Sequence, residues 1–146
     1  MFGITLRTRS MVATGAAIML GIAGLQHGVT AGTAHAAQAT PASVKVTLRD
    51  FSVTMSRQRL PAGTPIRFVI TNRGKAMHEA VLEPAGADDK ALEVRGRRYE
   101  ADDIAPGSTR TLIWIVPHAG KYQLACHMPG HFEMGMKTTF IVSAGK

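Results

Sequence analysis

The sequence predicts an all-β protein, a Greek-key β-sandwich of about seven to eight strands that follows an N-terminal signal peptide. Three observations predict this fold class. Apolar residues after residue 36 come in short alternating runs, no long stretch has the period of a helix, and turn residues separate the runs at roughly 8 to 15 residues. Short strands at such spacing are typical of β-sandwiches.

The first residues of the 146-residue chain have the features of a secretory signal peptide. Arg7 and Arg9 provide positive charge, residues 11–25 are apolar, and the motif "AHA" at 34–36 predicts cleavage before Ala37. The apolar run is shorter than the ~20 residues that a transmembrane helix needs, and an uncleaved membrane anchor is the alternative. Because a threonine separates the two arginines, the twin-arginine signal is absent and the general secretory route is expected.

Export divides the chain into a signal peptide at 1–36 and one domain at 37–146. The domain has about 110 residues, which suffices for a two-layer core. We expect it in the periplasm or another extracytoplasmic space, as a monomer, with no stable membrane insertion after cleavage.

The charge balance is basic. The formal net charge is +7, and losing Arg7 and Arg9 with the signal peptide leaves about +5, which favours acidic partners. Export, an aromatic content of 5% and the spread of basic residues along the chain argue against nucleic acid. A redox partner protein with an acidic surface is therefore expected.

The apolar runs predict six of the strands, in chain order, at 43–50, 66–72, 78–83, 109–116, 120–126 and 137–142. The run at 109–116 is almost entirely apolar, which is typical of a central strand covered on both faces. The segment 84–108 is polar and charged, so we expect a long crossover between sheets. A helical turn is expected within it around "DDKALEV" at 88–94.

The stretch "CHMPGHFEMGM" at 126–136 contains the only cysteine of the chain. Strand alternation points Cys126 into the sandwich near its end. The Pro-Gly pair that follows ends the strand and turns the chain, which brings His131 back toward the thiol. The alternative is a buried inert cysteine among methionines that fill the core.

His78 is the candidate for a third ligand, because it begins a well-patterned strand. His127 neighbours Cys126 on the opposite strand face and is expected at the surface. Two imidazoles, a thiolate and a thioether form the soft His₂Cys set with a weak axial methionine that is found in copper electron-transfer sites. Zinc also accepts cysteine and histidine, but methionine is a poor zinc ligand.

These residues make the chain similar to the cupredoxins, the type 1 (blue) copper proteins. The loop "CHMPGHFEMGM" and the preceding "GKYQLA" resemble the Cys-x₄-His loop and its strand in azurins and auracyanins. The resemblance also covers "PAGTPIRFVITNRGKAMHEAVL", so that it spans nearly all of 42–144. It implies one type 1 copper ion per chain, with His78, Cys126 and His131 as equatorial ligands.

The axial ligand has two candidates, Met134 and Met136. Met136 is favoured, because "GMKTTFIV" resembles the ending of auracyanin-like members. The chain departs from azurins and plastocyanins at Glu79, where they usually have asparagine. There "KAMHEAVL" more closely resembles exported cupredoxin-like proteins associated with copper tolerance. A carboxylate next to a ligand histidine can alter the reduction potential or colour of the copper site, because groups around the ligands orient them and tune the metal.

The resemblance implies an exported electron carrier that cycles between Cu(II) and Cu(I). The alternative is a periplasmic copper-tolerance protein that binds or sequesters copper, which the additional soft side chains of Met77, Met128, Met134 and His127 support. An enzyme is not expected, because too few histidines remain for a second copper centre and no hydrolase or phosphate-binding motif is present.

Overall fold

The computed structural model describes residues 40–145, so the predicted signal peptide at 1–36 lies outside the described residues. All regular secondary structure in the described part consists of β-strands, which confirms the all-β prediction. Within these residues, no helix is long and apolar enough to cross a membrane.

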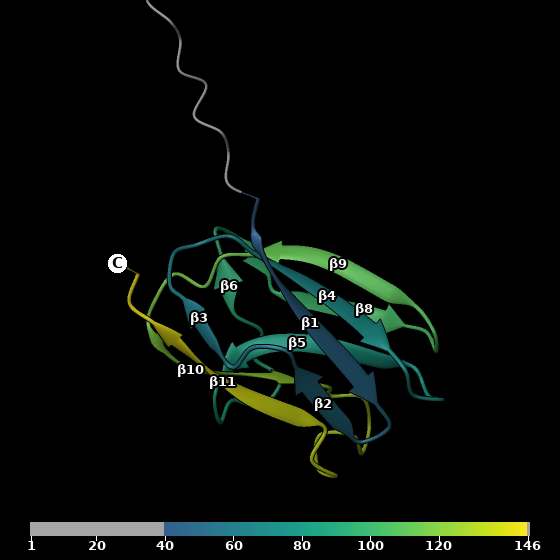
Figure 1. The fold of residues 1–146 in the computed structure, drawn as a ribbon. Helices are drawn as coiled ribbons and strands as arrows, with labels where there is room; N and C mark the ends of the chain where they lie inside the picture. The colour runs from purple at the N-terminus through teal and green to yellow at the C-terminus, as the bar shows by residue number, and fades with distance from the viewer. Residues whose placement is uncertain (1–39, 146) are drawn as a thin grey trace, which may run out of the picture. The chain divides into compact units, whose positions relative to one another are not determined.

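Two sheets form the sandwich (Figure 1). The first has the order β2-β1-β4-β9 and consists of β1 (Ala42–Arg49), β2 (Ser52–Met55), β4 (Ile66–Asn72) and β9 (Thr109–Trp114). The second has the order β3-β11-β10-β5-β8 and consists of β3 (Arg59–Pro61), β5 (His78–Pro84), β8 (Glu100–Ile104), β10 (Gly120–Ala125) and β11 (Lys137–Ser143). Many consecutive strands lie in different sheets, as in Greek-key folds.

The alternation in the sequence builds the core between the sheets. Phe68 and Ile70 of β4 are fully buried, and parallel pairing aligns them with Val44 and Val46 of β1. Buried residues of the second sheet belong to the same cluster. Burying each such side chain contributes ~1.5–3 kcal/mol, so this shared core holds the two sheets together.

The structure has more strands than the seven to eight predicted, and the additional ones are short. Four strands, including β6 (Glu93–Val94) and β7 (Arg97–Arg98), have only 2 to 4 residues. The other seven have 5 to 8 residues. A strand of two or three residues contains too few alternating positions to be seen in a sequence.

Strand β9 lies at the edge of its sheet, so the prediction of a central strand covered on both faces is wrong. Among residues 40–145 it pairs only with β4, and Ile113 is 48% exposed. Trp114 at its end is buried, with ring centroids 5.0 Å from Phe68 and 5.5 Å from Tyr99. In the apolar run, buried Trp114 and Val116 therefore alternate with the exposed residues Ile113 and Ile115.

The crossover after β5 contains a hairpin, and the predicted helical turn at 88–94 is wrong. Strands β6 and β7 pair antiparallel around Arg95 and Gly96, whose φ angles are 53° and 74°. Two successive positive φ angles are typical of the type I′ turn that joins hairpin strands, and glycine adopts this conformation without strain. The Arg-Gly pair thus favours a tight hairpin over a helix.

A buried polar network attaches the crossover to the second sheet. The Nε2 group of Gln123 donates to Oε1 of buried Glu83 at 2.7 Å and to the carbonyl of Ala87 at 3.0 Å. The amide of Lys90 donates to the other Glu83 oxygen at 2.9 Å. The side chain of His127 is only 7% exposed, with Nε2 2.9 Å from Glu83, so the expectation of a surface histidine is wrong.

Candidate metal centre

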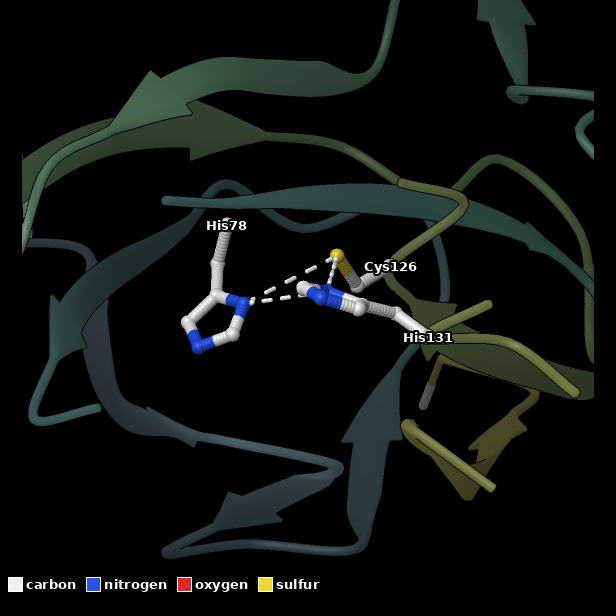
Figure 2. Close-up of side chains that lie close together, drawn as sticks. All are labelled: His78, Cys126 and His131. Carbon is white, nitrogen blue, oxygen red and sulfur yellow. Dashed lines mark hydrogen bonds between the residues drawn. The ribbon is translucent and has the colours of Figure 1, made fainter. Parts of the chain in front are cut away.

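Three side chains predicted as ligands converge at one end of the sandwich (Figure 2). The Nδ1 atom of His78 lies 3.3 Å from Nδ1 of His131 and 4.0 Å from Sγ of Cys126. The third side of this triangle, from Sγ to Nδ1 of His131, is 3.4 Å. His78 and Cys126 are fully buried and His131 is half-buried.

The triangle has the dimensions of a metal site. A point in its plane lies about 2.1 Å from all three donor atoms, close to the ~2.0–2.3 Å bonds of protein-bound metals to imidazole nitrogen and thiolate sulfur. Soft thiolate with two imidazoles suits copper, and three donors in a trigonal arrangement leave room for a weak axial ligand. The residues present therefore fit a type 1 copper ion.

Two side chains fix the segment that leads from β4 into His78. Asn72 at the end of β4 donates from Nδ2 to the carbonyls of Ala76 and Ile104, at 2.8 and 2.7 Å. Asp50, which follows β1, accepts the amides of Lys75 and Ala76. The start of β5 is held from both sides, so His78 enters the site from a rigid backbone.

The loop 126–136 is closed by hydrogen bonds between its own backbone groups. The Cys126 amide donates to the carbonyl of Met136 at 3.0 Å, and the Met136 amide donates to the carbonyl of His131 at 3.0 Å. Gly130 and Gly135 have φ angles of 81° and 91°, which residues with a side chain rarely adopt. The tight turns return His131 toward Cys126, as the sequence predicts.

Burial separates the two methionines that the sequence offers as axial ligand. Met136 is fully buried in the core cluster that also contains Cys126, whereas Met134 is 62% exposed. A thioether in contact with a buried metal must itself leave solvent, so burial favours Met136.

Burial disfavours the charged forms of His78 and Cys126 before a metal binds. Burial lowers the pKa of His78, an effect that the hydrogen bond from Nε2 of His78 to the Asp50 carboxylate opposes. Burial raises the pKa of the Cys126 thiol, although the backbone amides of Glu79 and Met128 oppose this shift. His78 is thus held in the neutral form that binds metals, whereas the Cys126 thiol has to lose its proton to solvent before it can bind a metal as a thiolate.

Glu79 links the two segments that supply ligands. Its Oε1 accepts the backbone amide of His127, next to Cys126, at 2.6 Å. Burial raises the pKa of this carboxyl group. The residue at which the chain departs from azurins therefore joins β5 to the ligand loop.

Sequence reasoning missed Asp50, Glu83 and Gln123. Asp50 lies in the turn after β1, where an aspartate is common for local reasons. Glu83 and Gln123 occupy outward positions of alternating strands, and only the crossover that covers them makes them buried. The one signal in the sequence for such a network is Glu83, a charged residue in the otherwise strand-like run "HEAVLE".

The comparisons with known proteins agree with this geometry. Residues 15–142 match the cupredoxin-like domain family. The chain is 36% identical over 87 residues to the copper-resistant cuproprotein CopI of Rubrivivax gelatinosus, across 55% of this chain and 53% of that protein. It is 28% identical over 139 residues to the copper-resistant cuproprotein CopI of Pseudomonas aeruginosa, across 70% of this chain and 76% of that protein.

The chain therefore spans about half to three quarters of the length of these curated relatives. Among solved structures, auracyanin B matches with a TM-score of 0.58 and 24% identity, over 71% of this chain and 91% of that chain. This likeness shows a shared fold.

Proposed function

The chain belongs to the cupredoxin-like family and binds copper, and we propose that it is an exported carrier of single electrons. The observation that carries this proposal is the convergence of Nδ1 of His78, Sγ of Cys126 and Nδ1 of His131 where β5 meets the closed loop 126–136. Copper in such a set supplies a one-electron couple between Cu(II) and Cu(I).

We assign the ligands as the Nδ1 atoms of His78 and His131, the thiolate of Cys126 and the thioether of Met136. Burial of three of these four side chains excludes water from the donor atoms. The hydrogen bonds at Asn72 and within the loop 126–136 keep the donors in place, so that little rearrangement accompanies a change of charge. His131 is the most exposed of the four and is the proposed point of electron entry and exit.

Substitution of Met136 by leucine tests the axial assignment. Met136→Leu is expected to raise the reduction potential by tens of millivolts, because loss of a thioether donor and a more apolar surrounding destabilise Cu(II) relative to Cu(I). Protein-film voltammetry measures the shift. Met134→Leu is the matched control and should leave the potential unchanged, whereas a shift in this exposed control alone would reverse the assignment.

Electron exchange tests the carrier function itself. The copper-loaded protein is expected to give a reversible one-electron wave and a fast self-exchange rate, measured from the broadening of NMR lines in mixtures of reduced and oxidised protein. A fast rate requires donors that do not rearrange. Irreversible voltammetry, with release of copper on reduction, would contradict a carrier.

The cellular setting follows from the same proposal. The predicted signal peptide at 1–36 places the domain in an extracytoplasmic space, and its positive net charge suits an acidic redox partner. Arg49 and Arg73 line one open groove beside Gly74, close to the segment that leads to His78, and this charge supports docking of the partner near the site. The proposal includes the prediction that the chain catalyses no reaction of its own.

Copper tolerance is the second candidate, supported by the names of the CopI relatives. Met77 and Met134 are 41% and 62% exposed, and such thioethers can capture Cu(I). This function predicts more than one Cu(I) per chain in anaerobic titrations and copper sensitivity of a strain that lacks the protein. A carrier predicts one copper ion per chain and no change in copper sensitivity.

A further inference from the structure

The two ring nitrogens of His78 face different groups. Nδ1 is directed toward Cys126 and His131, and the other ring nitrogen lies on the far side of the ring (Figure 2). That second atom, Nε2, is 3.2 Å from Oδ1 of Asp50. The imidazole thus lies between the cluster of donor atoms and a carboxylate.

The Asp50 carboxylate is fixed independently of His78. It accepts the amide of Lys75 at 3.0 Å and that of Ala76 at 3.2 Å. The strand before it is also fixed, because the Arg73 amide donates to the carbonyl of Leu48 at the end of β1 at 2.8 Å. The carboxylate is therefore a preformed acceptor and does not depend on the histidine for its position.

Gly74 leaves the space that this contact needs. A Cβ atom at residue 74 would lie 2.7 Å from Nε2 of His78 and would collide with Oδ1 of Asp50. Any larger residue would push the carboxylate and the imidazole apart. The backbone of the segment 73–77 is thus shaped around the pair formed by Asp50 and His78.

We propose that Asp50 is a positioning residue that sets the tautomer and the donor strength of His78. The carboxylate accepts the hydrogen bond of Nε2–H, so that the lone pair is on Nδ1 and points to the metal position. Carboxylate–histidine–metal arrangements fix the ring and raise the basicity of the ligand. A stronger donor with a negative charge behind it favours Cu(II) over Cu(I), so Asp50 lowers the reduction potential. This role rests on the proposed copper site.

Two substitutions separate the charge of Asp50 from its hydrogen bond. Asp50→Asn removes the charge and keeps an oxygen acceptor, whereas Asp50→Ala removes both. Asp103→Asn is the matched control, since it makes the same charge change at an exposed position, with a φ of 48° that asparagine tolerates. Thermal melts of the copper-free proteins show whether the alanine variant is folded, and Asp50→Asn is the test if it is not.

The first readout needs no copper. Long-range ¹H–¹⁵N spectra of the copper-free protein should show His78 protonated at Nε2 in the wild type, in Asp50→Asn and in Asp103→Asn, and a mixture of tautomers in Asp50→Ala. Protonation at Nδ1 in the wild type, or no change in the alanine variant, would overturn the positioning role. This result does not depend on whether the site binds copper.

The second readout is the copper-loaded protein. Groups that support metal ligands typically change metal affinity by 10–100-fold. Asp50→Asn is expected to weaken Cu(II) binding about tenfold with little effect on Cu(I), which raises the potential by about 59 mV for a one-electron couple. An unchanged potential in both Asp50 variants would overturn the tuning role. Failure of the wild type to bind copper would instead refute the proposed function.

Discussion

Replacement of Cys126 by serine is expected to abolish the intense thiolate-to-copper absorption of the protein. It should also weaken Cu(II) binding by more than about a hundredfold, which exceeds the ~10–100-fold effect of groups that only support metal ligands. The thiolate is the only sulfur anion that the described residues can offer, because the chain has a single cysteine. A serine hydroxyl is a hard, weakly acidic donor and does not replace it. Visible spectroscopy and competition titrations measure both effects.

The control for this substitution is His118→Asn, which alters an exposed histidine outside the cluster and should keep the spectrum. Reversible bleaching of the band by a mild reductant would complete the assignment. A visible band that survives in Cys126→Ser, or a thiol that remains equally reactive after copper is added, would contradict coordination through sulfur.

Replacement of Trp114 by alanine is expected to have the largest effect on stability, about 3–5 kcal/mol in the free energy of unfolding. The indole is 1% exposed and packs on both Phe68 and Tyr99, the latter with ring planes 11° apart. Tyr99 also bonds through its hydroxyl to the backbone of Ile115. Loss of the indole therefore leaves a cavity and removes the ring on which Tyr99 of the crossover packs.

Urea unfolding of the copper-free protein, followed by circular dichroism, measures this loss. Trp114→Phe should cost clearly less, since it keeps an aromatic ring in the cavity. Trp114 pairs with Ile66, about 20 Å along β4 from Asn72, so the copper spectrum of folded Trp114→Ala should be unchanged. A loss below 1 kcal/mol would show that the site collapses around the smaller residue.

Much of the fold was predictable, because alternation survives wherever a strand has one buried face. The run at 66–72 coincides with β4, and the runs at 78–83 and 137–142 differ from β5 and β11 by one residue. The prediction failed at β9, where composition alone could not tell an edge strand from a central one. It failed again at 88–94, because the residues there are compatible with a helix but the turn at Arg95 and Gly96 favours a hairpin.

The candidate site was predictable where its residues are adjacent in sequence or begin a strand. Cys126 and His131 share one loop, and His78 opens β5. Asp50 was not predictable, because it reaches His78 through the parallel pairing of β1 with β4 and the shape of the segment 73–77. His127 was misplaced because strand alternation does not reveal which outward faces another segment covers.

The hydrogen bond from the Cys126 amide to the Met136 carbonyl joins the first and last residues of the ligand loop. The residues between them belong to no strand, so a change in the length of the loop breaks no sheet hydrogen bond, and lengthening a loop costs little entropy. Three of the four proposed ligands lie on this one ligand loop. Insertion or replacement of a few loop residues can therefore retune the metal while the two sheets keep their hydrogen bonds.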